Sequence, residues 1–250
     1  MNKKMLEMAL LTVSLVMSAS AMADASLLSP YSADYDLERK GIGSAKATFT
    51  LTKQADGSYE YKSVLHPTGI AALLLGDVTQ TSDFKLVNGR PQSSSYAYSE
   101  KGKHASEESI QFDWAGKSAA TTEDGKQRKA ALSADSVDVQ LVQLLVASDL
   151  AAGKLPDSYQ IVNHGEATTY TVKALPDAKL RLQAGNFQTK VVALTTADKK
   201  RTITAWMAPN LHFLPVQIRQ VDKNTITLTL LHIAYSDEGA PAAAPATTTK

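Results

Sequence analysis

The chain has 250 residues, with 26 Lys and Arg against 25 Asp and Glu, and it contains no cysteine. The lack of cysteine excludes disulfides, thiolate nucleophiles and cysteine-bound metals. No segment concentrates Lys and Arg among aromatic residues, so nucleic-acid binding and adhesion to membranes through a polybasic patch are both disfavoured.

The N-terminus has the three parts of a secretory signal peptide. Lys3 and Lys4 give a basic start, residues 8–17 are mainly apolar, and the Ala-Met-Ala of residues 21–23 offers small side chains for cleavage. The apolar run is too short for an ordinary membrane span, so we expect a mature chain from about Asp24 and no stable membrane insertion. An uncleaved anchor is the alternative. Since no cysteine can carry a lipid anchor, the sequence predicts a soluble periplasmic protein of a Gram-negative cell and not a lipoprotein.

Beyond the N-terminus the dominant period is two. In residues 31–38 and 44–52, apolar and polar side chains alternate, which is typical of strands with one buried and one solvent-exposed face. The dipeptides Asp56-Gly57, Asn88-Gly89 and Asp124-Gly125 are typical of tight hairpin turns. The repeated pattern predicts a mainly β protein, with about ten to twelve strands in a single strongly curved antiparallel sheet or half-open β-barrel.

Two segments break this period. Residues 135–152 place apolar side chains at helical spacing, where Asp135 can cap the start and Gly153 can end the helix, so they predict an amphipathic helix. Residues 68–76 are rich in leucine and predict a short helix or loop. This second segment is either a plug packed into the core or a lid over a ligand.

The sequence is interpreted as one domain between two terminal segments. We expect a signal peptide at residues 1–23, a single β-rich domain at residues 24–236 and a disordered tail at residues 237–250. The tail is mainly Ala, Pro and Thr, and it has too little apolar surface to offset the entropy that ordering would cost.

The last two predicted strands form a hairpin with one strongly apolar face. If residues 222–224 form the turn, three side chains of one strand oppose three of the other: Leu214, Val216 and Ile218 against Ile226, Leu228 and Leu230. Trp206, on the preceding strand, falls on the side of Thr202 and Thr204, where it either covers the sheet edge or contacts a ligand. The apolar face is either dry core or one wall of a binding site.

Five segments, in a fixed order, resemble a known family. They are ADYDLERKGIGSAKATFTL, TGIAALLLGDVTQTSDF, the predicted helix ending in AAGKLP, GNFQTKVVAL and TAWMAPNLHFLPVQI. The chain resembles the domain of unknown function 3108, found in many Gram-negative envelope proteins, over about Tyr31 to Tyr235. The resemblance implies a strongly curved sheet, similar to the half-barrel of periplasmic lipoprotein carriers, with helical pieces against its concave side. It implies no established activity and no catalytic residues.

No motif of an enzyme is present. The sequence lacks a Gly-x-Ser-x-Gly elbow, a His-Glu-x-x-His pair and a phosphate-binding glycine loop. His212 and His232 are the one histidine pair expected to lie close together, and no third metal ligand accompanies them. We therefore expect no catalytic residue, no metal and no cofactor, and a protein that is not an enzyme.

Two functions fit these observations. The first is a carrier that binds a lipid, a lipoprotein acyl chain or another lipophilic envelope component in the concave face of the sheet. Its candidate ligand-binding residues are Ile70, Leu73, Leu74, Trp206, Leu214, Val216, Leu228 and Leu230. The alternative is an envelope interaction or adaptor protein with a dry core and a protein or polysaccharide partner. The fold alone cannot decide between these functions.

Overall fold

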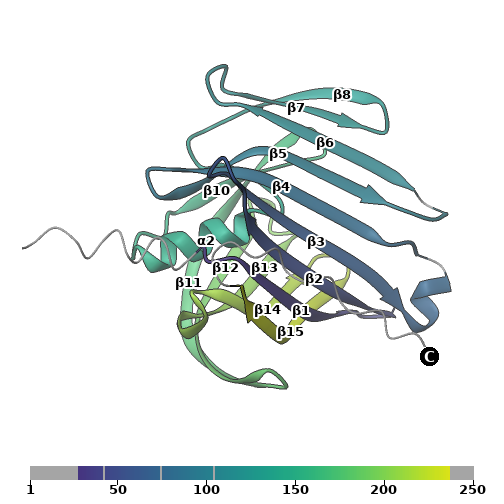
Figure 1. Ribbon diagram of the computed structural model, residues 1–250, viewed down its shortest axis with the longest axis vertical. Coiled ribbons are helices and arrows are strands. Elements are labelled where there is room, and N and C mark those ends of the chain that lie inside the picture. Colours follow the sequence, from purple (N-terminus) through teal and green to yellow (C-terminus); the bar gives the residue numbers. More distant parts are fainter. Residues whose placement is uncertain (1–27, 42, 74, 104, 237–250) are drawn as a thin grey trace, which may run out of the picture.

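The computed structural model describes residues 28–236 except residues 42, 74 and 104. Most of this part of the chain forms one sheet of fifteen strands in the order β8-β7-β6-β5-β4-β3-β2-β1-β15-β14-β13-β12-β11-β10-β9 (Figure 1). The sheet is open, with β8 and β9 at its edges. The predicted signal peptide and tail lie outside the described residues.

The elements follow one another along the chain in these ranges: β1 (Tyr31–Arg39), β2 (Gly43–Lys53), β3 (Tyr59–Thr68), η1 (Gly69–Leu73), β4 (Val78–Val87), β5 (Arg90–Glu100), β6 (Ser106–Asp113), β7 (Ser118–Glu123), β8 (Lys126–Ala131), β9 (Ser136–Asp138), α2 (Val142–Ala151), β10 (Ser158–Asn163), β11 (Glu166–Leu182), β12 (Gly185–Thr196), β13 (Thr202–Ala208), η2 (Pro209–Leu211), β14 (Leu214–Val221) and β15 (Thr225–Tyr235).

The predicted mainly β fold with a single curved sheet is confirmed, but the expected number of strands was too low. Period-two alternation puts Tyr31, Ala33 and Tyr35 of β1 on a buried face, called the core face below. Asn88-Gly89 and Asp124-Gly125 form hairpin turns in which all four φ angles are positive, as tight turns of this type require. The short strand β9 was missed, because it lies within the segment predicted as helix.

The predicted helix over residues 135–152 starts later than expected. Residues 136–138 form β9, which pairs parallel to β10, and the helix α2 begins at Val142. Asp135 does not cap it. The backbone N–H groups of Gln140 and Leu141, just before the helix, donate instead to the carboxylate of Asp138, at 3.0 and 2.8 Å. Gly153, with a positive φ, follows the helix as predicted.

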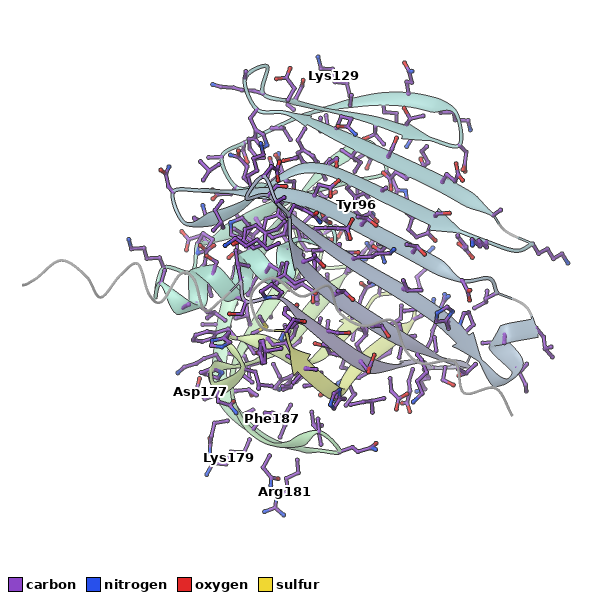
Figure 2. The ribbon with its side chains drawn as sticks, in the orientation of Figure 1. Tyr96, Lys129, Asp177, Lys179, Arg181 and Phe187 are labelled. Atoms are coloured by element: carbon purple, nitrogen blue, oxygen red, sulfur yellow. The ribbon has the colours of Figure 1, made fainter. Side chains whose placement is uncertain are left out.

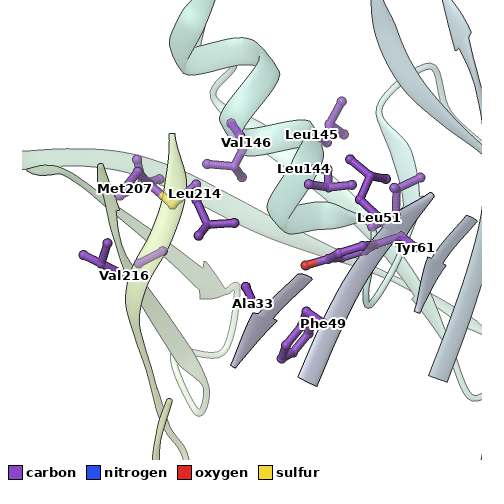
Figure 3. Close-up of a cluster of buried hydrophobic side chains, with 14 of the residues drawn as sticks. Ala33, Phe49, Leu51, Tyr61, Leu144, Leu145, Val146, Met207, Leu214 and Val216 are labelled. Carbon is purple, nitrogen blue, oxygen red and sulfur yellow. The ribbon is translucent and has the colours of Figure 1, made fainter. Parts of the chain in front are cut away.

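The helix α2 is buried on several sides and does not have one apolar and one wet face. Leu144, Leu145, Val146 and Ala147 are all buried, since α2 lies inside the curve of the sheet. Figure 3 shows Leu144 and Leu145 of α2 near Leu51 of β2 and Tyr61 of β3. Side chains of β13 and β14 lie on the other side of the helix (Figure 3). The helix therefore joins side chains of β2 and β3 with side chains of β13 and β14 in one hydrophobic core.

Because consecutive strands are antiparallel within β1 to β8 and within β10 to β15, their connections alternate between two ends of the sheet. At the end called the α2 end, Ser148 of α2 donates a hydrogen bond to the carbonyl of Gly89 in the β4–β5 turn. The other end, called the η1 end, holds the β1–β2, β3–β4, β5–β6, β7–β8, β10–β11, β12–β13 and β14–β15 connections. The β11–β12 hairpin extends away from the body of the sheet and carries Lys179 and Arg181 near its tip (Figure 2).

Candidate functional site

One apolar part of the core face is a row of side chains across five neighbouring strands, and its centre is partly exposed. Directly paired positions point to the same side of a sheet, so this row forms a continuous stripe, called the apolar belt. Its members are Ala205 on β13, Ile218 on β14, Leu228 on β15, Leu37 on β1 and Ala45 on β2. The central three, Ile218, Leu228 and Leu37, are partly exposed.

The rows on either side of the belt differ in chemistry. Toward the α2 end, the side chains of the neighbouring row, Tyr35, Leu230 and Ala47, are all buried. Toward the η1 end, the neighbouring row is Ile203, Gln220, Ile226, Arg39 and Gly43. The belt therefore lies between a filled core and a rim that contains one cation.

Arg39 is the charged member of this rim. Its Nε atom is buried and has no hydrogen-bond partner within the described part of the chain. A buried donor without a partner costs free energy, and a guanidinium group binds carboxylate or phosphate oxygens strongly. An acidic group bound beside the belt would supply the missing acceptor.

The predicted ligand-binding residues fall in three separate places. Leu214, Val216 and Leu230 are in the closed core, where each is at most 4% exposed. Leu228 lies on the apolar belt. Trp206 pairs with Val191 and Gln217, so it points to the face opposite its neighbour Ala205 of the belt.

The leucine-rich segment lies at the η1 end. It forms the short helix η1, as one of the two predicted forms, and its side chains Ile70 and Leu73 are 75% and 84% exposed. Leu74 lies outside the described residues. Neither Ile70 nor Leu73 fills the core in this structure, and the structure does not bring these two residues together with Leu214, Val216 and Leu230.

Sequence reasoning missed Leu37 and Arg39 as site residues. The signal was present, because the alternation that buries Tyr31, Ala33 and Tyr35 continues through residues 37 and 39. What the sequence did not reveal is that Leu228 lies opposite Leu37, in a pairing between strands about 190 residues apart.

A cavity lies beside α2 in the closed core. It is lined by Leu144 and Ala147 of the helix and by Leu214, His212 and Tyr235, among others. Its volume is about 20 Å³, which is room for a single water molecule. An acyl chain cannot fit there without displacing core side chains.

A cluster of titratable side chains joins β6, β7 and β8, near one edge of the sheet, to the β10–β11 turn near the other edge. His164, in the β10–β11 turn, lies with Nδ1 2.6 Å from Glu123 Oε1, and its backbone N–H donates to Glu108 at 2.6 Å. Arg128 of β8 donates to the carbonyl of His164 at 2.7 Å. Burial raises the pKa of Glu108. The cluster connects β6, β7 and β8 with the β10–β11 turn.

Within the described residues, no group of three or more His, Cys, Asp or Glu side chains is arranged to hold a metal ion. No helix in residues 28–236, with the three gaps named above, is long and apolar enough to cross a membrane.

The fold is similar to that of solved bacterial structures. A beta-barrel-like protein of domain of unknown function DUF1849 from Brucella abortus aligns with a TM-score of 0.59 and 10% identity, over 84% of this chain and 99% of that chain. MucB aligns with a TM-score of 0.36 and 12% identity, over 90% and 58% of the two chains. An exported protein with a YmcC-like fold from Bacteroides fragilis aligns with a TM-score of 0.35 and 8% identity, over 82% and 95%. The first likeness shows a shared fold, and the other two support no conclusion.

The family follows from the sequence itself. The model of the family described as "Protein of unknown function (DUF3108)" matches residues 31–231, which is most of the chain. The protein belongs to this family. No curated protein matches the chain.

Proposed function

We propose that the protein is a non-enzymatic component of the Gram-negative envelope that binds a lipophilic molecule with an acidic headgroup on the apolar belt. The observation that carries the proposal is the partial exposure of Leu37, Ile218 and Leu228, next to a row of the core face (Tyr35, Leu230 and Ala47) that is buried. Ligand sites in proteins combine an apolar lining with a few polar groups that fix the orientation.

The two ends of the proposed ligand follow from the two sides of the belt. An apolar chain along the belt removes the exposed surface of its three central side chains from water, which is favourable at about 25 cal/mol per Å². The headgroup lies toward the η1 end, where Arg39 has an unpaired buried Nε. A lipid or an acyl chain with a phosphate or carboxylate at one end meets both requirements.

Export to the periplasm is part of the proposal. It is supported by the basic start, the short apolar run and the Ala-Met-Ala site of the N-terminal segment. In the periplasm, a lipophilic molecule that moves between membranes needs a protein to shield its apolar part from water.

The second candidate is an adaptor that uses its outer surface to bind a protein or polysaccharide. It is favoured by the filled core around α2, where the one cavity described above holds no more than a water molecule. In this case the belt is only the margin of the core, and the protein needs no small ligand.

Native mass spectrometry separates the two candidates. The protein is purified from periplasmic extract under mild conditions, and any copurified lipid is extracted and identified. Leu228→Gln puts a polar side chain on the belt. Its matched control is Thr229→Gln, because Thr229 is the next residue of β15, also partly exposed, and points to the opposite face.

Binding on the belt predicts extra mass on the wild type and on Thr229→Gln, and a loss of that mass on Leu228→Gln. Arg39→Gln should retain apolar ligands but release the acidic ones, because only the headgroup contact is removed. Equal ligand content in Leu228→Gln and Thr229→Gln, or a wild type without ligand even after incubation with envelope lipids, argues for the adaptor.

A further inference from the structure

The short helix η1 holds two large apolar side chains in water. The side chains of Ile70 and Leu73 are 75% and 84% exposed, although the helix itself packs against β2 and β3. Between them Ala71 is buried, and it lies so close to Gly43 of β2 that a Cβ on Gly43 would stand 2.8 Å from the Ala71 Cβ. The exposure of Ile70 and Leu73 is therefore imposed by the packing of η1, which extends beyond the end of β3 (Figure 1).

Lysines from separate turns lie beside this helix. Directly after η1, the chain passes so close to the β5–β6 turn that a Cβ on Gly76 would overlap the carbonyl oxygen of Lys101. The backbone N–H of Lys101 also donates to the carbonyl of Asp77 at 2.9 Å. On the other side, the β1–β2 turn carries Lys40, whose N–H donates to the carbonyl of Thr225 at 3.1 Å. Lys103 and Lys223 extend the same row of turns.

The acidic residues of these connections are already engaged. Asp77 lies 2.9 Å from His66 Nδ1, Asp198 lies 3.2 Å from Lys200 Nζ, and Asp222 lies 3.4 Å from Arg201 Nε. Lys40, Lys101, Lys103 and Lys223 are exposed, and within the described residues none of them has an ion-pair partner. In the three connections next to η1, the β1–β2, β3–β4 and β5–β6 connections, three lysines (Lys40, Lys101 and Lys103) therefore stand against one carboxylate, that of Asp77.

The α2 end of the same strands has a different composition. Three of its connections, β2–β3, β4–β5 and β13–β14, carry a single formal charge, that of Asp56, when His212 is neutral, whereas the β6–β7 connection carries Lys117 and the β11–β12 hairpin carries Lys179 and Arg181 near its tip (Figure 2). What distinguishes the η1 end is therefore the combination of lysines with two apolar side chains, Ile70 and Leu73, that are far more exposed than Leu86 and Val87 at the α2 end.

We propose that the η1 end docks on the surface of an anionic phospholipid bilayer. Ile70 and Leu73 enter the boundary between headgroups and acyl chains, and the surrounding lysines contact the anionic headgroups. Each basic residue near such a surface strengthens binding by about fivefold, and inserted apolar side chains add to this. The occupant is a bilayer and not a second copy of this chain, since two copies joined tip to tip would bring their lysines together. The inference does not depend on the proposed lipid ligand, because an adaptor could dock in the same way.

The direct test is cosedimentation of the protein, as exporting cells process it, with phospholipid vesicles. Vesicles of phosphatidylethanolamine with phosphatidylglycerol and cardiolipin are compared with vesicles of phosphatidylcholine alone. We expect binding to the anionic vesicles that weakens with added salt, because surface charge is screened. Ile70→Ser/Leu73→Ser should weaken binding by about tenfold. Lys101→Gln/Lys103→Gln should weaken it by about fivefold for each lysine.

The chain offers a matched control for each variant. Leu86 and Val87, at the α2 end of β4, are 36% and 42% exposed, so Leu86→Ser/Val87→Ser also removes exposed apolar surface. Lys53→Gln/Lys85→Gln removes two lysines from the same end. Both controls should bind vesicles like the wild type.

The absence of cysteine allows a second, positional readout. A single environment-sensitive fluorophore on Leu73→Cys should shift its emission to the blue when anionic vesicles are added, and the same label on Leu86→Cys should not. The proposal is overturned if the protein fails to bind anionic vesicles, if the η1 variants bind as well as their controls, or if both labels respond alike. It is also overturned if light scattering shows a dimer that Ile70→Ser/Leu73→Ser dissolves. Loss of vesicle binding with retained lipid mass, or the reverse, separates this inference from the proposed ligand site.

Discussion

The carboxylate of Asp138 on β9 accepts a hydrogen bond of 2.6 Å from the hydroxyl of Ser93 on β5. The two strands are not neighbours in the sheet, so this contact crosses the core. Ser82 of β4 adds a second hydroxyl at 2.7 Å, and two backbone N–H groups before α2 complete the set. The carboxylate therefore accepts four hydrogen bonds, three at Oδ1 and one at Oδ2, which fasten the β9–α2 segment across the inside of the sheet.

The first prediction concerns the loss of this fastening. Asp138→Ala leaves two hydroxyls and two N–H groups buried without their acceptor, and it should lower the free energy of unfolding by about 3 kcal/mol. Asp138→Asn keeps the size and one acceptor oxygen, and it should cost about 1 kcal/mol. Urea denaturation monitored by circular dichroism gives both values. A smaller loss for Ala than for Asn would contradict this role of Asp138.

The second prediction is the pH dependence of the same residue. Burial raises the pKa of Asp138 above its ordinary value, against the opposing effect of its hydrogen bonds. A folded-state pKa above the unfolded one means that this carboxyl stabilises the folded state at low pH. The contribution is lost as the pH rises from about 3.9 through the folded pKa.

Relative to Asp138→Asn, which cannot titrate, the wild type should therefore lose stability as the pH is raised from about 4 to 7. The difference between the two unfolding free energies, measured in urea at several pH values, isolates this residue from other titrating groups. A difference that grows with rising pH would show that the hydrogen bonds, and not burial, dominate its pKa.

The third prediction concerns the ion pair that holds α2 to β5. Arg90 donates from Nε and Nη2 to the two carboxylate oxygens of Asp149, both at 2.8 Å, and Tyr159 donates to the same carboxylate at 2.8 Å. The Asp149 side chain is buried, whereas that of Arg90 is 39% exposed, so solvent screens part of the pair.

Arg90→Ala should destabilise the protein by about 2 kcal/mol, because it leaves a buried carboxylate with one neutral donor. Arg90→Lys should recover only part of this loss, since an ammonium group cannot make both bonds in the same plane. Arg181→Ala, on the exposed part of β11, is the control and should change stability by less than about 0.5 kcal/mol. Thermal or urea unfolding that ranks Arg181→Ala with Arg90→Ala would contradict the assignment.

The fourth prediction tests the contact between β8 and the β10–β11 turn. Gly165 and Gly125 both have positive φ angles, of 71° and 78°. A Cβ on Gly165 would lie 2.5 Å from the Cβ of Arg128, whereas a Cβ on Gly125 would meet nothing within 4 Å. Gly125→Ala should cost about 1 kcal/mol for the backbone conformation alone, and Gly165→Ala should cost more. Hydrogen exchange should show faster exchange in β8 and β10 for Gly165→Ala only.

The fifth prediction separates core from belt within one strand. Leu230 is completely buried, so Leu230→Ala should cost about 3 kcal/mol, near the middle of the usual range for such substitutions. Leu228→Ala, on the partly exposed belt, should cost about 1 kcal/mol. If Leu228→Ala proves as costly as Leu230→Ala, the belt is core, and the proposed ligand site loses its main support.

The sequence by itself determined the local structure of this protein. Alternation along β1 and β2, turn dipeptides such as Asn88-Gly89 and the helical spacing before Gly153 each depend on residues that are near one another in the chain. These signals were enough to predict a curved β-sheet with one helix. They also indicated Leu228 as a candidate residue.

Only the tertiary structure decided what these elements enclose and expose. It placed Leu37 and Arg39 opposite Leu228 and Ile226, and it put Leu214 and Leu230 in a core closed by α2. It also brought Lys40 and Lys101, from separate turns, to either side of η1, although no linear segment of the chain is strongly basic. The physical reason is that strand pairing and sheet curvature depend on contacts between residues far apart in sequence, which the local pattern of side chains does not specify.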